Sequence, residues 1–143
     1  MKKVTLKRLI ENSNISAKLI RAVVKQSGGW ESFAESAPDI SNHGIDGGFH
    51  GWISYRETTG FFKRNRAAIM EMAEEQAQDF GTGVLEMVQG FGVFRNDPIS
   101  ADSLARAIYQ GKGEDAITVQ NVMAWYAAEE VARLYNDMRV EEV

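Results

Sequence analysis

Two long segments with helical apolar spacing constrain the fold of this chain more than any other feature. Each segment repeats apolar residues every three to four positions over several turns, which is typical of a helix with one buried face. We expect helices over about residues 58–80 and 114–138, and they form the central pair of a compact, mainly α-helical single domain spanning 1–143. The first stripe comprises Phe62, Ile69, Met72, Ala73 and Phe80. The second comprises Val119, Val122, Met123, Tyr126, Ala127, Val131 and Leu134.

Shorter helices are expected before the first long one. A helix is predicted over about 4–12, and Ser16 is a suitable N-cap for the next, which Gly28 would end. A third should cover 30–36 and end before Pro38, because the residue preceding a proline is biased away from the α region.

Between and after the long helices, turn residues divide the chain. Thr82 is predicted to cap a short helix over 82–89, and glycines and Pro98 indicate a loop over 90–98. Ser100 should cap the following helix, and the tail 139–143 is expected to fray. The predicted buried face of the helix that follows Ser100 comprises Leu104, Ala107 and Ile108.

Residues 41–55 combine four glycines with aromatic residues and both histidines of the chain. The glycines permit positive φ, so the segment can fold tightly against another element, with a short strand or irregular backbone over 49–55. Phe49, Trp52 and Tyr55 then fill the core between the long helices, or they anchor a partner protein together with Phe91 and Phe94, since aromatic side chains dominate binding hot spots.

Composition limits the class of protein. The chain has 143 residues and 44% apolar residues, as expected for one globular domain. No apolar run approaches the roughly 20 residues of a membrane helix. Lys7, Arg8 and Glu11 interrupt any signal-peptide core, and no cysteine is available for a disulfide or a thiolate site. We therefore expect a cytoplasmic protein without a membrane partner.

Charge is distributed unevenly along the chain. Residues 1–25 carry a net charge of +6 and residues 71–143 a net charge of −9, within a total of −4. A basic cluster can bind nucleic acid, and an acidic one can bind a basic protein surface. The basic candidates are Lys7, Arg8, Lys18, Arg21, Lys25, Lys63 and Arg64, with Arg66 beside them. The acidic candidates are Glu71, Glu74, Glu75 and Asp79, with Glu129, Glu130 and Asp137 further along the chain.

Catalytic patterns are scarce. His43 and His50, with Asp39, Asp46 or Glu57, supply residue types that bind zinc or iron, but their spacing matches no metal-binding motif. The glycines are not followed by the lysine of a phosphate-binding loop, and no Gly-x-Ser-x-Gly motif is present. We assign no catalytic residue and no cofactor, and a small metal-dependent enzyme at His43 and His50 stays an alternative.

Three motifs together resemble a known family. They are Gly28-Gly29-Trp30-Glu31-Ser32-Phe33, the segment from His43 to Tyr55, and the segment from Ala124 to Arg133. This string is similar to that of small proteins of unassigned function from phages, prophages and plasmids, over nearly the whole chain. Trp52 and Ser54 stand where Phe and Tyr are expected in that pattern.

The resemblance implies a biological setting rather than a reaction. Accessory proteins of mobile elements often act by stoichiometric binding to host machinery, and anti-CRISPR or other anti-defence inhibitors are one such class. The leading hypothesis is therefore a non-enzymatic interaction protein in the host cytoplasm that binds a host or defence-system protein. A nucleic-acid-binding accessory protein is the second hypothesis. A homodimer is compatible with both, because Trp125 lies partly off the main apolar face of 114–138.

Overall fold

The computed structural model describes residues 3–42 and 55–141, and these residues are mainly α-helical with no strand. The mainly α-helical class predicted from the sequence is confirmed. The helices are α1 (Leu6–Glu11), α2 (Ala17–Gln26), α3 (Trp30–Asn42), α4 (Tyr55–Asp79), α5 (Val84–Gln89), α6 (Gly92–Asn96), α7 (Ala101–Ala105), the π-helical segment η1 (Arg106–Gln110) and α8 (Ala116–Glu141).

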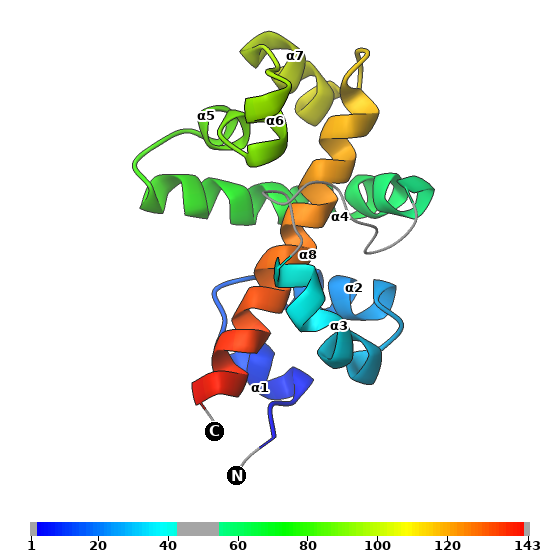
Figure 1. The fold of residues 1–143 in the computed structure, drawn as a ribbon, viewed down its shortest axis with the longest axis vertical. Coiled ribbons are helices and arrows are strands. Elements are labelled where there is room, and N and C mark those ends of the chain that lie inside the picture. The colour runs from blue at the N-terminus through cyan, green and yellow to red at the C-terminus, as the bar shows by residue number, and fades with distance from the viewer. Residues whose placement is uncertain (1–2, 43–54, 142–143) are drawn as a thin grey trace.

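Helix α8 is the axis of the molecule. Figure 1 shows α1, α2 and α3 grouped around its C-terminal half, α5, α6 and α7 beside its N-terminal half, and α4 crossing between the two groups. Residues 119–129 of α8 are all buried, because helices cover it from several sides. The expected packing of α4 on α8 is present, and α3 contacts α8 as extensively. A helix buried all round explains why α8 carries apolar residues well beyond one stripe.

Capping residues define the helix ends where the sequence indicated them. The Oγ atom of Ser16 accepts a hydrogen bond from the amide of Leu19 at 3.2 Å, and Ser100 accepts one from Ser103 at 3.2 Å. After α4, Gly81 adopts φ 72°, and the amides of Gly81 and Thr82 donate to carbonyls of the last turn. This Schellman arrangement needs a left-handed residue, so glycine is the suitable residue there.

The predicted end of the third helix at Pro38 is wrong. Helix α3 continues through Pro38 to Asn42. Proline removes one amide donor from the helix, and its ring crowds the carbonyl four residues before it. Burial offsets that loss, because Ala37 and Ile40 lie in the core, and Nδ2 of Asn136 on α8 donates to the carbonyl of Ala37 at 3.1 Å. Tertiary packing therefore outweighs the local bias against helix.

Phe80 is not part of the buried stripe of α4, contrary to the sequence prediction. Its side chain is 74% exposed, whereas Phe62, Ile69 and Ala73 on the same stripe are buried. The helix ends at Asp79, so Phe80 is the first residue after α4 and leads into the left-handed turn at Gly81. Figure 1 shows this end of α4 projecting away from α8. An exposed phenyl ring at the end of a long helix results.

The segment between the two long helices contains more helix than predicted. The loop expected over 90–98 includes α6, which buries Phe94. Gly83, not Thr82, is the N-cap of α5, and the Thr82 hydroxyl instead donates to Oε2 of Glu86 at 2.6 Å. The helix that begins after Ser100 widens into the π-helical segment η1, which the left-handed Gly111 ends.

Helix α4 is kinked at Asn65, whose backbone has φ −120° and ψ 16°. The Asn65 side chain is buried, and its Nδ2 atom donates to the carbonyl of Phe61 at 3.0 Å. A side chain that bonds the preceding turn is a recognised cause of helix bending. The kink separates an N-terminal half of α4 that carries basic residues from a C-terminal half that carries acidic ones.

Helix α8 extends past the predicted end at Met138 to Glu141. Trp125 is 2% exposed, so it is part of the core and does not supply the off-face surface expected for a homodimer. No helix among the residues described has the length and apolar character to span a bilayer. The predicted strand or irregular segment at 49–55 lies outside the described residues, apart from Tyr55, which begins α4.

Candidate partner-binding surface and cleft

The C-terminal half of α4 presents an acidic surface. Glu71, Glu74, Glu75 and Asp79 are all exposed, and their spacing of three to four residues places them along neighbouring strips of one side of the helix. The structure thus brings together the four acidic residues singled out from the sequence. We call these four residues the acidic face.

The acidic face lowers the stability of its own helix. A helix C-terminus carries partial negative charge, so carboxylates in the last turns are repelled, and α4 has no basic residue in its last turn. Glu71 and Glu75, and likewise Glu75 and Asp79, are like charges four residues apart, which adds repulsion. The stability of the fold therefore does not explain why these carboxylates are at the C-terminal end of α4.

Neutralising the acidic face should therefore stabilise the protein. The triple variant Glu74→Gln, Glu75→Gln, Asp79→Asn is expected to raise the free energy of unfolding by about 1 kcal/mol at low salt. Urea denaturation followed by circular dichroism measures this change. Glu31→Gln is the matched control, since Glu31 lies in the first turn of α3, where a carboxylate is favoured, and its neutralisation should lower stability. A loss of stability in the triple variant would contradict the argument.

A cleft of about 390 Å³ lies beside the acidic face, between the end of α4, α5 and α8. One wall is apolar: the rings of Phe91 and Tyr126 lie 5.3 Å apart between centroids with their planes tilted by 38°, and the exposed Phe80 is at the edge. Its volume is within the range of small-ligand pockets. The lining residues are Gln76, Asp79, Phe80, Met87, Phe91, Tyr126, Glu129, Glu130 and Arg133.

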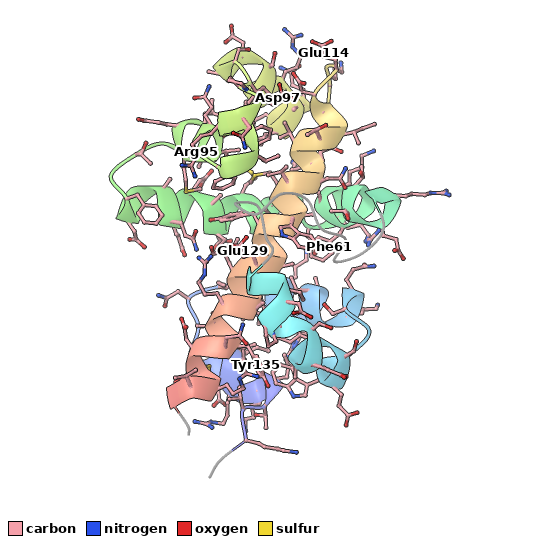
Figure 2. The ribbon with its side chains drawn as sticks, viewed as in Figure 1. Phe61, Arg95, Asp97, Glu114, Glu129 and Tyr135 are labelled. Carbon is pink, nitrogen blue, oxygen red and sulfur yellow. The ribbon has the colours of Figure 1, made fainter. Side chains whose placement is uncertain are left out.

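The polar side of the cleft is a hydrogen-bonded chain that joins α4 to α8. The Tyr126 hydroxyl donates to Oε1 of Gln76, and Nε2 of Gln76 donates to Oε2 of Glu130 at 3.0 Å. Arg133 then donates to Glu130 Oε1 at 2.9 Å and to Glu129 Oε1 at 2.5 Å. Figure 2 shows Glu129 on α8 close to the crossing with α4.

Glu129 is an unusual member of this chain because it is only 4% exposed. Carboxylates are rarely buried to this degree unless they are paired, and the pair usually stabilises a fold no more than apolar residues would. The ion pair with Arg133 meets the first condition. Because a buried ion pair of this kind adds little stability, stability alone does not explain why Glu129 is at this position.

Burial of Tyr126 raises the pKa of its phenol well above the ordinary value, and the neighbouring Glu130 carboxylate raises that pKa further. The neutral phenol is thus favoured in the folded state. Above the ordinary pKa of about 10, tyrosine ionises in the unfolded chain but not in the folded one. The free energy of unfolding should consequently fall as pH rises from about 10.

Tyr126→Phe should remove this contribution to the alkaline loss of stability. At neutral pH the variant should be less stable by about 1 kcal/mol, because Gln76 loses its donor. Denaturation between pH 8 and pH 11 measures both effects. Tyr109→Phe, at an exposed position, is the control and should keep the wild-type slope. An unchanged slope in Tyr126→Phe would contradict the assignment.

The basic residues are only partly brought together. Lys18, Arg21 and Lys25 are exposed along one side of α2. Helix α2 packs against α4, and Nη2 of Arg64 donates to Oε1 of Gln26 at 3.2 Å, which places Arg64 and its neighbour Lys63 near them.

The basic residues of α1 are placed differently. Lys7 is 3.9 Å from Glu11 on the same helix, and Arg8 is half-buried and engaged within the fold. Helix α1 packs on α8. The basic residues that remain as candidates for nucleic-acid binding therefore lie on α2 and on the N-terminal half of α4.

Other predicted site residues are less informative. His43, His50, Phe49 and Trp52 lie outside the described residues, as does the side chain of Tyr55. Among the residues that the structure describes, no group of three acidic or histidine side chains is arranged to hold a metal ion.

The cleft has no signature in the sequence as a whole. Gln76 and Tyr126 are 50 residues apart, and only the crossing of α4 and α8 joins them. The spacing of Glu129, Glu130 and Arg133 at three and four residues is a detectable signal for ion pairs on one helix. That spacing does not reveal burial, which comes from the neighbouring helices.

The fold and the cleft define a class: an all-α domain with an acidic helix end beside an apolar cleft. The particular family follows from the sequence comparison. Residues 12–140 match the model of a family described as a domain of unknown function, DUF7222, and the chain belongs to this family. No curated protein and no solved structure matches the chain.

Proposed function

We propose that this protein acts without catalysis, by binding a basic surface of another protein through the acidic face and Phe80. One observation carries the proposal: a phenyl ring that is 74% exposed stands at the end of a helix whose last turns hold carboxylates at a cost to stability. Aromatic side chains are enriched in protein interfaces, and surface charge complementary to a partner steers and orients its binding.

The chemistry of this surface favours a protein partner. Carboxylates repel phosphate groups, so the acidic face is unsuited to nucleic acid. They attract lysine and arginine, which increases the rate of association and fixes orientation. Phe80 and the apolar wall of the cleft supply the hydrophobic contact that charge alone lacks.

We propose a mobile element as the biological setting, with the protein acting in the host cytoplasm on a host or defence-system complex. The motif string from Gly28 to Arg133 supports this setting through its resemblance to phage, prophage and plasmid proteins. Inhibition of a CRISPR or other defence complex is the form of action that this setting suggests.

A second candidate function has its own supporting observation. The hydrogen bond from Arg64 to Gln26 joins α4 to α2 and gathers the exposed Lys18, Arg21 and Lys25 near Arg64. Such a cluster can bind a nucleic-acid backbone with strong salt dependence. It lies at the other end of α4 from the acidic face, so the two functions can be separated by mutation.

Affinity capture from the cell that encodes the protein tests the main proposal. The quadruple variant adds Phe80→Ala to Glu74→Gln, Glu75→Gln and Asp79→Asn. The matched control removes three exposed carboxylates of α3 and one exposed apolar side chain of α8, as Glu31→Gln, Glu35→Gln, Asp39→Asn and Val140→Ala. The wild type and the control should retain a stoichiometric, nuclease-resistant protein that the quadruple variant loses. Equal recovery by both variants, or recovery that nuclease abolishes, would refute the proposal.

A further inference from the structure

Two carboxylates in the cleft are largely buried, whereas the arginine side chain that pairs with them is half exposed to solvent. The side chains of Glu129 and Glu130 are 5% and 15% exposed, whereas that of Arg133 is 50% exposed. One guanidinium group bonds both carboxylates, through Nη2 to Glu129 at 2.5 Å and through Nη1 to Glu130 at 2.9 Å. The cleft therefore already holds one guanidinium group, contributed by its own chain.

The surroundings of this pair suit a second guanidinium side chain. Phe80, Phe91 and Tyr126 line the cleft, and a planar guanidinium group stacks on aromatic faces. Three carboxylates and one arginine line it, so its wall is net negative. The carboxylate of Asp79, at the edge, has no hydrogen bond or ion pair within the part of the chain that the structure describes.

We propose that the cleft receives an arginine side chain of the partner, and that Arg133 occupies this position in the free protein. The inference rests on the proposed function, since it assumes a protein partner. Exchange of one guanidinium for another keeps Glu129 and Glu130 paired throughout, which avoids an unpaired buried carboxylate. Arg133 can turn outward because half of its side chain is already in solvent.

An arginine fits this site better than a lysine does. The bonds to Glu129 and Glu130 use two nitrogens of one planar fork, and an ammonium group offers a compact charge without that geometry. The gain on binding comes from the partner's aliphatic stem against Phe80 and Phe91, and from Asp79, which acquires a counter-ion. In the free protein the ion pairs of Arg133 are with Glu129 and Glu130 and do not include Asp79.

Titration of a blocked arginine tests the inference without a partner. N-acetyl-L-arginine amide is added to the isolated Arg133→Ala protein and followed by NMR chemical shifts. Removal of the internal competitor should make binding saturable and at least about tenfold tighter than in the wild type. Arg106→Ala removes an exposed arginine of η1, outside the cleft, and should behave as the wild type. Arg133→Ala with Glu130→Gln should lose the binding.

Folding of each variant is checked by circular dichroism, and Arg133→Gln, which keeps a hydrogen-bond donor, replaces Arg133→Ala if the latter unfolds. Absence of saturable binding in the folded variant would overturn the inference. Equal binding of N-acetyl-L-lysine amide would overturn the selectivity for guanidinium. Tighter binding of free L-arginine than of the blocked amide would indicate a small-molecule site and overturn the assignment to a protein partner.

This result is independent of affinity capture. A failed titration overturns the arginine inference and leaves a captured partner unaffected. A failed capture overturns the proposed function and leaves the titration unaffected.

Discussion

Replacement of Phe33 by alanine is expected to lower the free energy of unfolding by about 3–5 kcal/mol, the usual cost of removing a buried phenyl ring. Phe33 is fully buried in α3. Its ring lies 5.8 Å from that of Trp30 and 5.7 Å, edge to face, from that of Tyr135 on α8. The variant loses these aromatic contacts and leaves a cavity where α3 meets α8.

Urea denaturation at 25 °C measures this change. Glu35→Ala, at an exposed position of the same helix, is the control and should alter stability by no more than about 0.5 kcal/mol. A loss of less than about 1.5 kcal/mol in Phe33→Ala would contradict the close packing of α3 on α8.

The second large effect concerns binding. The quadruple variant of the acidic face and Phe80 should bind the captured partner at least about 100-fold more weakly than the wild type, because it loses three charges and an aromatic anchor at once. Its fold should be intact, since all four side chains are exposed. Stability and affinity are therefore expected to change independently, which separates loss of the surface from loss of the fold.

The salt dependence of the same interaction provides a further check. Pairing between the acidic face and a basic partner weakens as salt screens surface charge, so wild-type affinity should fall between about 50 and 300 mM salt. The quadruple variant, which retains Glu71 of the acidic face, should show a shallower dependence. Identical salt dependence would indicate that the acidic face is outside the interface.

The fold could be predicted from the sequence where local patterns and tertiary packing agree. Both long helices follow from apolar spacing. Ser16 and Ser100 are of a residue type that favours the N-cap, and their hydroxyls accept hydrogen bonds from amides of the first turn. The failures occur where packing opposes the local pattern. Pro38 stays helical because Ala37 and Ile40 are buried, and Phe80 is exposed because α4 ends at Asp79, at the end that projects away from α8 (Figure 1).

The candidate site could be predicted only in part. Charge along the chain identified the acidic face, since neighbouring positions on a helix are fixed by its geometry. The cleft depends on the crossing of α4 and α8, which brings Gln76 to Tyr126 and buries Glu129. Contacts between residues so far apart in sequence have no local signal. The helical spacing of 114–138 also suggested that Trp125 lies off the apolar face, whereas α8 is covered on all sides there.

The most direct test of the central claim compares partner affinity in two variants of opposite charge. One is the quadruple variant of the acidic face, and the other is Lys18→Gln, Arg21→Gln, Lys25→Gln on α2. Dissociation constants for the purified partner, measured by titration calorimetry at physiological salt, should rise at least about 100-fold in the first and less than about twofold in the second. The reverse order would contradict the claim and favour binding through the basic surface of α2 and α4.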